Sequence, residues 1–144
     1  MIPTTEYTST SKQRKNLAIW IEALRSGEYM QGQYALMTFD NAYCCLGVAC
    51  EKLNLGVSLY LNKNLYSKMF ADEFGLYGYS YTTNNDVDIL SNLNDSGEYD
   101  EIGSLVPNSR YNFSQIADLL ENYLDLLNVI AADEEGITDN GELN

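Results

Sequence analysis

Two amphipathic patterns near the ends of the chain place the strongest limits on its fold. The first is an apolar stripe made of Leu17, Trp20, Ile21 and Leu24. A second stripe extends over residues 116–127, and both have the three- and four-residue spacing of one face of an α-helix. Between them the sequence contains only short segments with strand-like or helical patterns. We therefore predict an α+β fold, with three to five helices packed on a small antiparallel sheet in a single domain.

Capping residues indicate where the two long helices begin and end. Ser11 is predicted to cap the first helix, and Gly27 to end it in the left-handed conformation that glycine adopts easily. Asn112 and Gln115 predict a capping box for the last helix, which we expect to end near Ala131. The chain then divides into a flexible N-terminus (1–10), a globular domain (11–131) and an acidic flexible tail (132–144).

A β-hairpin is predicted after the first helix. Residues 34–39 and 42–45 have strand-like patterns, and Asp40-Asn41 between them is a turn candidate. A short helix is expected over residues 46–53, with Gly47 allowing it to pack closely and a Schellman-like closure at residues 54–56. The remaining expected elements are a strand at 57–61 and helices at 63–74 and 86–93.

The charge of the chain is strongly uneven. The formal net charge is −13, and the sequence contains no histidine. Residues 1–70 carry a net charge of +2, whereas residues 71–144 carry −15 and have Arg110 as their only basic residue. This excess of carboxylates argues against direct binding to nucleic acid or to anionic membranes, because both require Lys and Arg. It favours cationic partners instead.

The absence of histidine limits the available chemistry. Ser-His-Asp triads, Cys-His dyads and His-ligated zinc are excluded. An enzyme that uses carboxylates and a divalent metal is the least favoured alternative, because no paired-carboxylate motif with metal spacing occurs. We therefore expect no catalytic residue, no metal site and no cofactor. Cys44, Cys45 and Cys50 are odd in number and closely spaced, which is a poor disulfide framework. We interpret them as buried, reduced thiols, and a reactive Cys45 or Cys50 is the alternative.

Two groups of motifs resemble a known family. Residues 20–32 follow the pattern W-x-x-A-L-R-S-G-x-Y-x-Q-G, and residues 44–50 follow C-C-L-G-V-x-C. An L-N-D-x-G motif at 93–97 and an F-x-x-I-A motif at 113–117 come later. The set resembles a family of small tailed-bacteriophage proteins without an assigned activity. The resemblance implies a phage accessory protein and transfers no catalytic residue, and residues 98–112 look like an insertion relative to the family pattern.

The strongest ligand-binding candidate lies at the end of the first helix. Arg25, Tyr29 and Gln31, together with Arg14, could hold a phosphate or carboxylate and stack on a base. The structural interpretation of the same residues is that Arg25 pairs with an acidic residue of the second half. We favour the structural interpretation because charge pairs often serve the fold.

An interface is the second candidate site. Tyr77, Tyr79 and Tyr81 would project from one face of an extended segment, close to Asp86 and Asp88. The aspartates and Asn94-Asp95 could also bind a cation, but the spacing does not match an EF-hand, and capping or turn roles are favoured.

The leading hypothesis is a non-enzymatic phage accessory protein that acts in the host cytoplasm during infection. It would bind a host protein with a basic surface through an acidic, tyrosine-rich face, and inhibition of host defence is one outcome of such binding. The first alternative is a protein that sequesters a small nucleotide signal in a pocket around Arg25 and Tyr29, completed by a second copy in a homo-oligomer. The second alternative is a minor virion or assembly protein.

Overall fold

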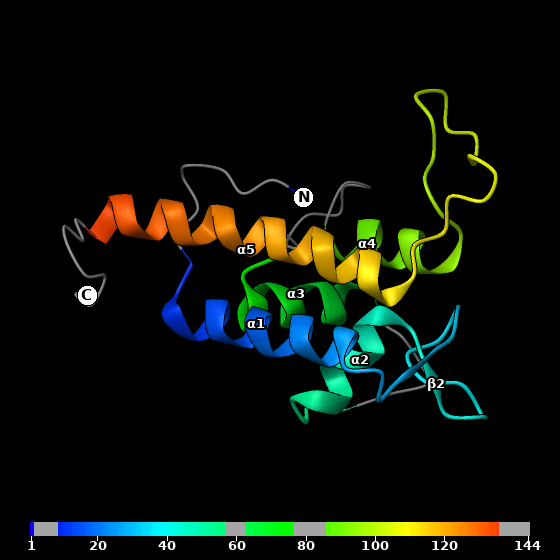
Figure 1. Ribbon diagram of the computed structural model, residues 1–144, viewed down its shortest axis with the longest axis horizontal. Coiled ribbons are helices and arrows are strands. Elements are labelled where there is room, and N and C mark those ends of the chain that lie inside the picture. The colour runs from blue at the N-terminus through cyan, green and yellow to red at the C-terminus, as the bar shows by residue number, and fades with distance from the viewer. Residues whose placement is uncertain (2–8, 57–62, 77–85, 136–144) are drawn as a thin grey trace.

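Helices dominate the architecture, and the two longest lie along each other (Figure 1). The computed structural model describes residues 1, 9–56, 63–76 and 86–135, with the side chains of 63–67 and 134–135 excepted. Its elements are α1 (Ser11–Arg25), β1 (Met30–Gln31), β2 (Ala42–Tyr43), α2 (Cys45–Lys52), α3 (Lys63–Phe74), α4 (Asp86–Asp95) and α5 (Phe113–Glu135). The predicted α+β class is therefore confirmed. The strand predicted at 57–61 and the tyrosines at 77, 79 and 81 lie outside the described residues.

The sheet differs from the prediction in its direction. β1 and β2 are parallel, with Met30 opposite Ala42 and Gln31 opposite Tyr43, so the predicted antiparallel sheet is wrong. The predicted strand at 34–39 is interrupted at once, because Tyr34 has a left-handed φ of 66°. The chain instead forms a loop over residues 32–41 that returns alongside β1. Only a single antiparallel bridge, between Met37 and Tyr43, remains of the predicted hairpin.

The ends of α1 are fixed by local hydrogen bonds. Thr10, rather than the predicted Ser11, is the N-cap: its hydroxyl accepts from Gln13 N at 3.1 Å, and Gln13 Oε1 accepts from Thr10 N at 2.9 Å. The one-residue error arises because Thr and Ser are neighbours with similar capping ability. Gly27 has a φ of 80°, which confirms its predicted left-handed conformation.

The other predicted helix ends are confirmed with two extensions, because α4 continues past the predicted Leu93 to Asp95 and α5 continues past Ala131. α2 ends in a Schellman motif in which Asn54 adopts a φ of 55° and Leu55 N donates to Cys50 O at 2.9 Å. At the start of α5, Asn112 and Gln115 exchange two side-chain-to-backbone hydrogen bonds of 2.9 Å. α5 continues to Glu135, so residues 132–135 of the predicted tail are helical.

The core is built around Trp20 of α1. Its indole ring is fully buried and contacts Phe70 and Phe74 of α3, with ring centroids 5.4 and 4.8 Å away. The indole Nε1 donates to the backbone oxygen of Cys45 at 2.9 Å, which ties α1 to α2. α5 covers the other side of α1 and contributes Ile116, Leu120 and Leu127 to the same cluster. In the described residues, no helix is long and apolar enough to cross a membrane.

Candidate functional site

A buried asparagine connects the segments that carry the sequence motifs. Asn94 lies in the last turn of α4 and is fully buried. Its Oδ1 accepts from Gln31 Nε2 at 2.9 Å and from Cys45 N at 3.1 Å. Its Nδ2 donates to Gly32 O at 2.9 Å and to Asp95 Oδ1 at 2.8 Å. One side chain therefore joins α4, β1 and the start of α2, and all its hydrogen-bonding groups are satisfied.

Neighbouring bonds extend this Asn94 junction to two loops. We call residues 32–41 the short loop and residues 98–109 the long loop. Asp95 Oδ1 accepts from Tyr34 N of the short loop at 3.0 Å. Gln31 Nε2 also donates to Tyr111 O at 2.9 Å, and Arg110 Nε donates to Asp95 O at 3.1 Å, just after the long loop. The bases of both loops are thus held by the same few residues.

Two glycines let the backbone segments of the junction come together. A Cβ on Gly47 of α2 would overlap the carbonyl oxygen of Leu36 in the short loop. Gly97 has a φ of 121°, and a Cβ there would overlap the hydroxyl group of Ser109. The prediction that Gly47 permits a close approach is confirmed, although its neighbour is a loop and not the sheet. Three of the four motifs that carry the resemblance, at 20–32, 44–50 and 93–97, therefore meet at one structural junction. Patterns within a single segment could not reveal this.

The long loop stands away from the helices at one end of the molecule (Figure 1). Tyr99 and Leu105 form an antiparallel bridge, and the Asp100 carboxylate accepts from the backbone N–H groups of Ile102 and Ser104 at 3.0 and 2.8 Å. These bonds order the tip of the loop. Ile102 at the tip is nevertheless 87% exposed, and Leu105 and Val106 are also exposed.

An open pocket of about 440 Å³ lies where the long loop meets the start of α5. Its lining includes Glu98, Ser109, Arg110, Tyr111, Asp118 and Leu119. Tyr111 donates its hydroxyl hydrogen to Glu98 at 2.7 Å, and this bond together with burial raises the pKa of Tyr111. The pocket has one carboxylate from the long loop, Glu98, and one from α5, Asp118. It therefore suits cationic or hydrogen-bonding groups.

The short loop also presents apolar side chains to solvent. Phe39 is completely exposed, and Tyr34 is 73% exposed. A left-handed backbone is unusual for a bulky residue such as Tyr34 and costs about 1–3 kcal/mol, which the surrounding structure must offset. The bond from Tyr34 N to Asp95 holds this conformation in place.

The four predicted ligand-binding residues do not form one site. Arg25 bonds Asp118 and Glu121 of α5 at 2.6 and 2.7 Å, which is the pairing that the structural interpretation predicted. Its hydrogen bonds to these carboxylates raise the pKa of Arg25. Arg14 lies about 16 Å away along α1, where its guanidinium group donates to Ser9.

Tyr29 and Gln31, the other two predicted ligand-binding residues, make contacts that stabilise the fold. The ring of Tyr29 packs edge-on against Tyr43, with centroids 5.4 Å apart, and partial burial raises the pKa of Tyr29. Gln31 uses both amide hydrogens in the Asn94 junction. The four residues that were predicted to form a nucleotide pocket therefore do not lie together.

The predicted interface is corrected at one aspartate. Asp86 is only 4% exposed at the start of α4, because the first turn of this helix is packed into the fold, and it does not belong on an exposed face. Asp88 is half-buried. In the part of the chain that the structure describes, no three His, Cys, Asp or Glu residues cluster in a way that could hold a metal ion.

The cysteines are free and buried, as predicted. Burial raises the pKa of Cys44 to about 11 and that of Cys50 to about 12, and it raises the pKa of Cys45 well above its usual value. A thiol with such a pKa carries very little thiolate near neutral pH, and the thiolate is the nucleophile. The geometry therefore favours apolar packing over reactivity at Cys45 and Cys50.

The fold and the site define a small α+β domain in which a polar junction supports two exposed loops. Residues 11–73, which run from the start of α1 almost to the end of α3, match a domain of unknown function, DUF8296. No curated protein and no solved structure matches the chain. The matched region covers less than half of the chain and ends before α4, so Asn94 joins it to the remainder.

Proposed function

We propose that the chain is a non-enzymatic phage accessory protein that binds a basic protein of the host cell. The observation that carries the proposal is the acidic face formed by α5 and the long loop. α5 contains six carboxylates and no Lys or Arg, and Asp118, Glu121 and Asp125 are exposed. Glu98, Asp100 and Glu101 add exposed carboxylates at the long loop. Phage origin rests on the sequence resemblance.

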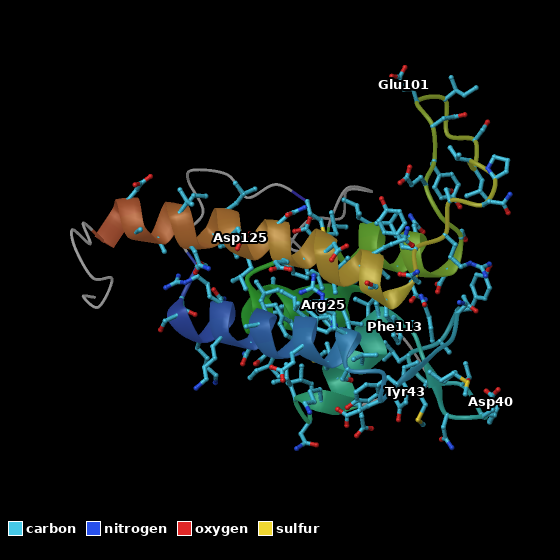
Figure 2. The ribbon with its side chains drawn as sticks, viewed as in Figure 1. Arg25, Asp40, Tyr43, Glu101, Phe113 and Asp125 are labelled. Atoms are coloured by element: carbon cyan, nitrogen blue, oxygen red, sulfur yellow. The ribbon has the colours of Figure 1, made fainter. Side chains whose placement is uncertain are left out.

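The positions of the charges support one-sided binding. Figure 2 labels Asp125 on α5 and Glu101 at the tip of the long loop, and both residues are exposed. The exposed lysines Lys12 and Lys15 lie at the start of α1, at the end of the molecule opposite the long loop (Figure 1). A charge distribution of this kind steers a basic surface toward the acidic face and speeds the encounter. A basic site of the host that is occupied in this way would be blocked, and inhibition of host defence is one result we propose.

The nucleotide alternative receives less support. A nucleotide site needs cationic groups that converge on phosphates, whereas Arg25 is engaged by two carboxylates and Arg14 lies far from it. The pocket beside the long loop is lined by one arginine, Arg110, and by two carboxylates, Glu98 and Asp118, which repel a phosphate.

Capture from host cells tests the proposal. The affinity-tagged chain is expressed in a bacterial host, and bound proteins are identified at about 0.1 M and 1 M salt, where the Debye length falls from about 10 to 3 Å. We expect a stoichiometric host protein at low salt that is lost at high salt. The double variant Glu101→Lys/Asp125→Lys should lose it, and the control Glu22→Lys/Glu28→Lys, with the same change in charge at exposed positions outside the acidic face, should retain it. Equal capture by both variants, or no stoichiometric protein from several hosts, would contradict the proposal.

A further inference from the structure

The pocket between the long loop and α5 is rich in hydrogen-bond acceptors. Its volume of about 440 Å³ falls within the range of about 300–1,000 Å³ that is typical of ligand sites. Glu98 lines it from the base of the long loop, and Asp118 from the second turn of α5. Three amide side chains, those of Asn108, Gln115 and Asn122, also line it. The pocket therefore combines polar groups from two different elements of the fold.

Each carboxylate of the pocket has one oxygen that is engaged by the chain itself. Oε1 of Glu98 accepts from the hydroxyl group of Tyr111 at 2.7 Å, and Oδ1 of Asp118 accepts from Arg25 at 2.6 Å. Among the described residues, no hydrogen bond reaches Oε2 of Glu98 or Oδ2 of Asp118. Both oxygens are thus available to a donor that enters the pocket.

The charges around the pocket leave room for one more cation. Arg25 bridges Asp118 and Glu121, so a single guanidinium group is shared by two carboxylates. Arg110 also lines the pocket and offsets the charge of Glu98. Two guanidinium groups therefore accompany three carboxylates, and one negative charge is not offset. A single additional cation would complete this balance.

An arginine side chain suits this set of groups better than another cation does. Its planar guanidinium group carries five N–H donors and is more weakly hydrated than an ammonium group, so it can bond two carboxylates and stack on an aromatic ring. Tyr111 and Leu119 are half-buried and line the pocket. They offer an aromatic ring to the guanidinium group and an apolar side chain to the methylene groups.

We infer that the pocket between the long loop and α5 receives one arginine side chain of the basic partner, whose guanidinium group is bound by Glu98 and Asp118. This inference rests on the proposed function, because it names the group of the partner that the acidic face recognises. It adds a specific, charge-assisted contact to the long-range attraction between the two surfaces.

Binding of small probes to the whole isotope-labelled chain tests the inference by NMR. The probes are Nα-acetyl-arginine amide, the matching lysine compound and the matching citrulline compound, which keeps the shape of the arginine side chain without its charge. We expect the arginine probe to shift the backbone amide signals of Ser109, Tyr111 and Leu119. It should bind at least about threefold more tightly than the lysine probe, and the citrulline probe should cause no such shifts. Equal binding of the lysine or citrulline probe, or shifts confined to other parts of the chain, would overturn the inference.

Conservative variants show whether the two carboxylates hold the probe. Glu98→Gln and Asp118→Asn each remove a charge and keep an acceptor oxygen for the partner within the chain, so the melting temperature should change little. Each should weaken binding of the arginine probe about tenfold, as expected for one charge-assisted hydrogen bond. Glu101→Gln and Asp125→Asn are the matched controls, because both positions are exposed on the same two elements and lie outside the pocket. Equal weakening in the controls would mean that only the overall charge matters, and it would overturn the inference.

Capture of the host protein separates a failure of this inference from a failure of the proposed function. The double variant Glu98→Gln/Asp118→Asn should capture at least about tenfold less host protein at low salt than the unmodified chain does. Undiminished capture by this variant, together with loss of capture in Glu101→Lys/Asp125→Lys, would overturn the arginine pocket and leave the acidic face standing. Binding of the arginine probe in the pocket without capture of any host protein would instead overturn the proposed function and support the arginine site.

Discussion

The Asn94 junction and the two loops that it supports follow opposite patterns of burial. In the junction, polar side chains are removed from water, and the described hydrogen-bonding groups of Asn94 all have partners. In the loops, large apolar side chains face solvent. The first pattern stabilises one arrangement of the chain, whereas the second exposes area that a folded domain alone would bury. The comparison separates residues that hold the structure from residues that are available to a partner.

The largest effect is expected at the centre of the junction. Asn94→Ala would leave the amide N–H of Cys45 and the carbonyl group of Gly32 buried without a partner, and we expect a loss of about 4 kcal/mol in the free energy of unfolding. Urea unfolding measures it. The control Asn92→Ala changes the same residue type at an exposed position of α4 and should cost less than about 0.5 kcal/mol. Similar values for the two variants would contradict the role of the junction.

A smaller loss is expected where α2 contacts the short loop. Gly47→Ala places a methyl group against the carbonyl oxygen of Leu36, and the resulting displacement should cost about 3 kcal/mol. Gly27→Ala is the control, because a Cβ there meets nothing within 4 Å and only the left-handed backbone costs about 1 kcal/mol. Urea unfolding should therefore rank Gly47→Ala as the more harmful change. The reverse order would show that the contact can relax.

Tyr34 should behave in the opposite way from the junction residues. Tyr34→Gly relieves the left-handed backbone and should raise the free energy of unfolding by about 1 kcal/mol, because the tyrosine side chain is exposed and little packing is lost. The control Gln33→Gly has no such strain to relieve and should lower stability by up to about 1 kcal/mol. A destabilising Tyr34→Gly would mean that the tyrosine side chain serves the fold.

The smallest effect is expected at the exposed ion pairs between α1 and α5. Arg25→Gln breaks the contacts with Asp118 and Glu121, and because these groups are exposed we expect a loss of only about 0.5–1 kcal/mol. The difference from the unmodified chain should shrink at about 1 M salt, where such pairs are screened. A loss that stays the same in salt would indicate a packing role for the arginine stem.

Local patterns in the sequence were sufficient for the helices. The stripes of α1 and α5, the capping box at Asn112 and the left-handed Gly27 were all predicted, because each depends on residues within a few positions of one another. The strand direction was missed because β2 pairs with Met30–Gln31, a two-residue segment without a strand pattern, and not with the predicted strand at 34–39, which begins at the left-handed Tyr34. The sequence placed this residue in a strand.

The site was less predictable than the helices for a physical reason. The charge imbalance correctly suggested a carboxylate partner for Arg25, although the partners Asp118 and Glu121 lie more than ninety residues away. The local sequence around Asn94 and Gln31 contains no pattern that distinguishes a buried junction from a turn or a ligand site. Only the three-dimensional fold brings residues 31, 45 and 94 together, and only it shows that Phe39 and Ile102 are exposed.

The most direct test of the separation between the junction and the exposed surface is the double variant Glu101→Lys/Asp125→Lys, measured for stability and for capture of the host protein. We expect a free energy of unfolding within about 0.5 kcal/mol of the unmodified chain, because both side chains are exposed, together with loss of capture. Full capture by a stably folded double variant would contradict that separation.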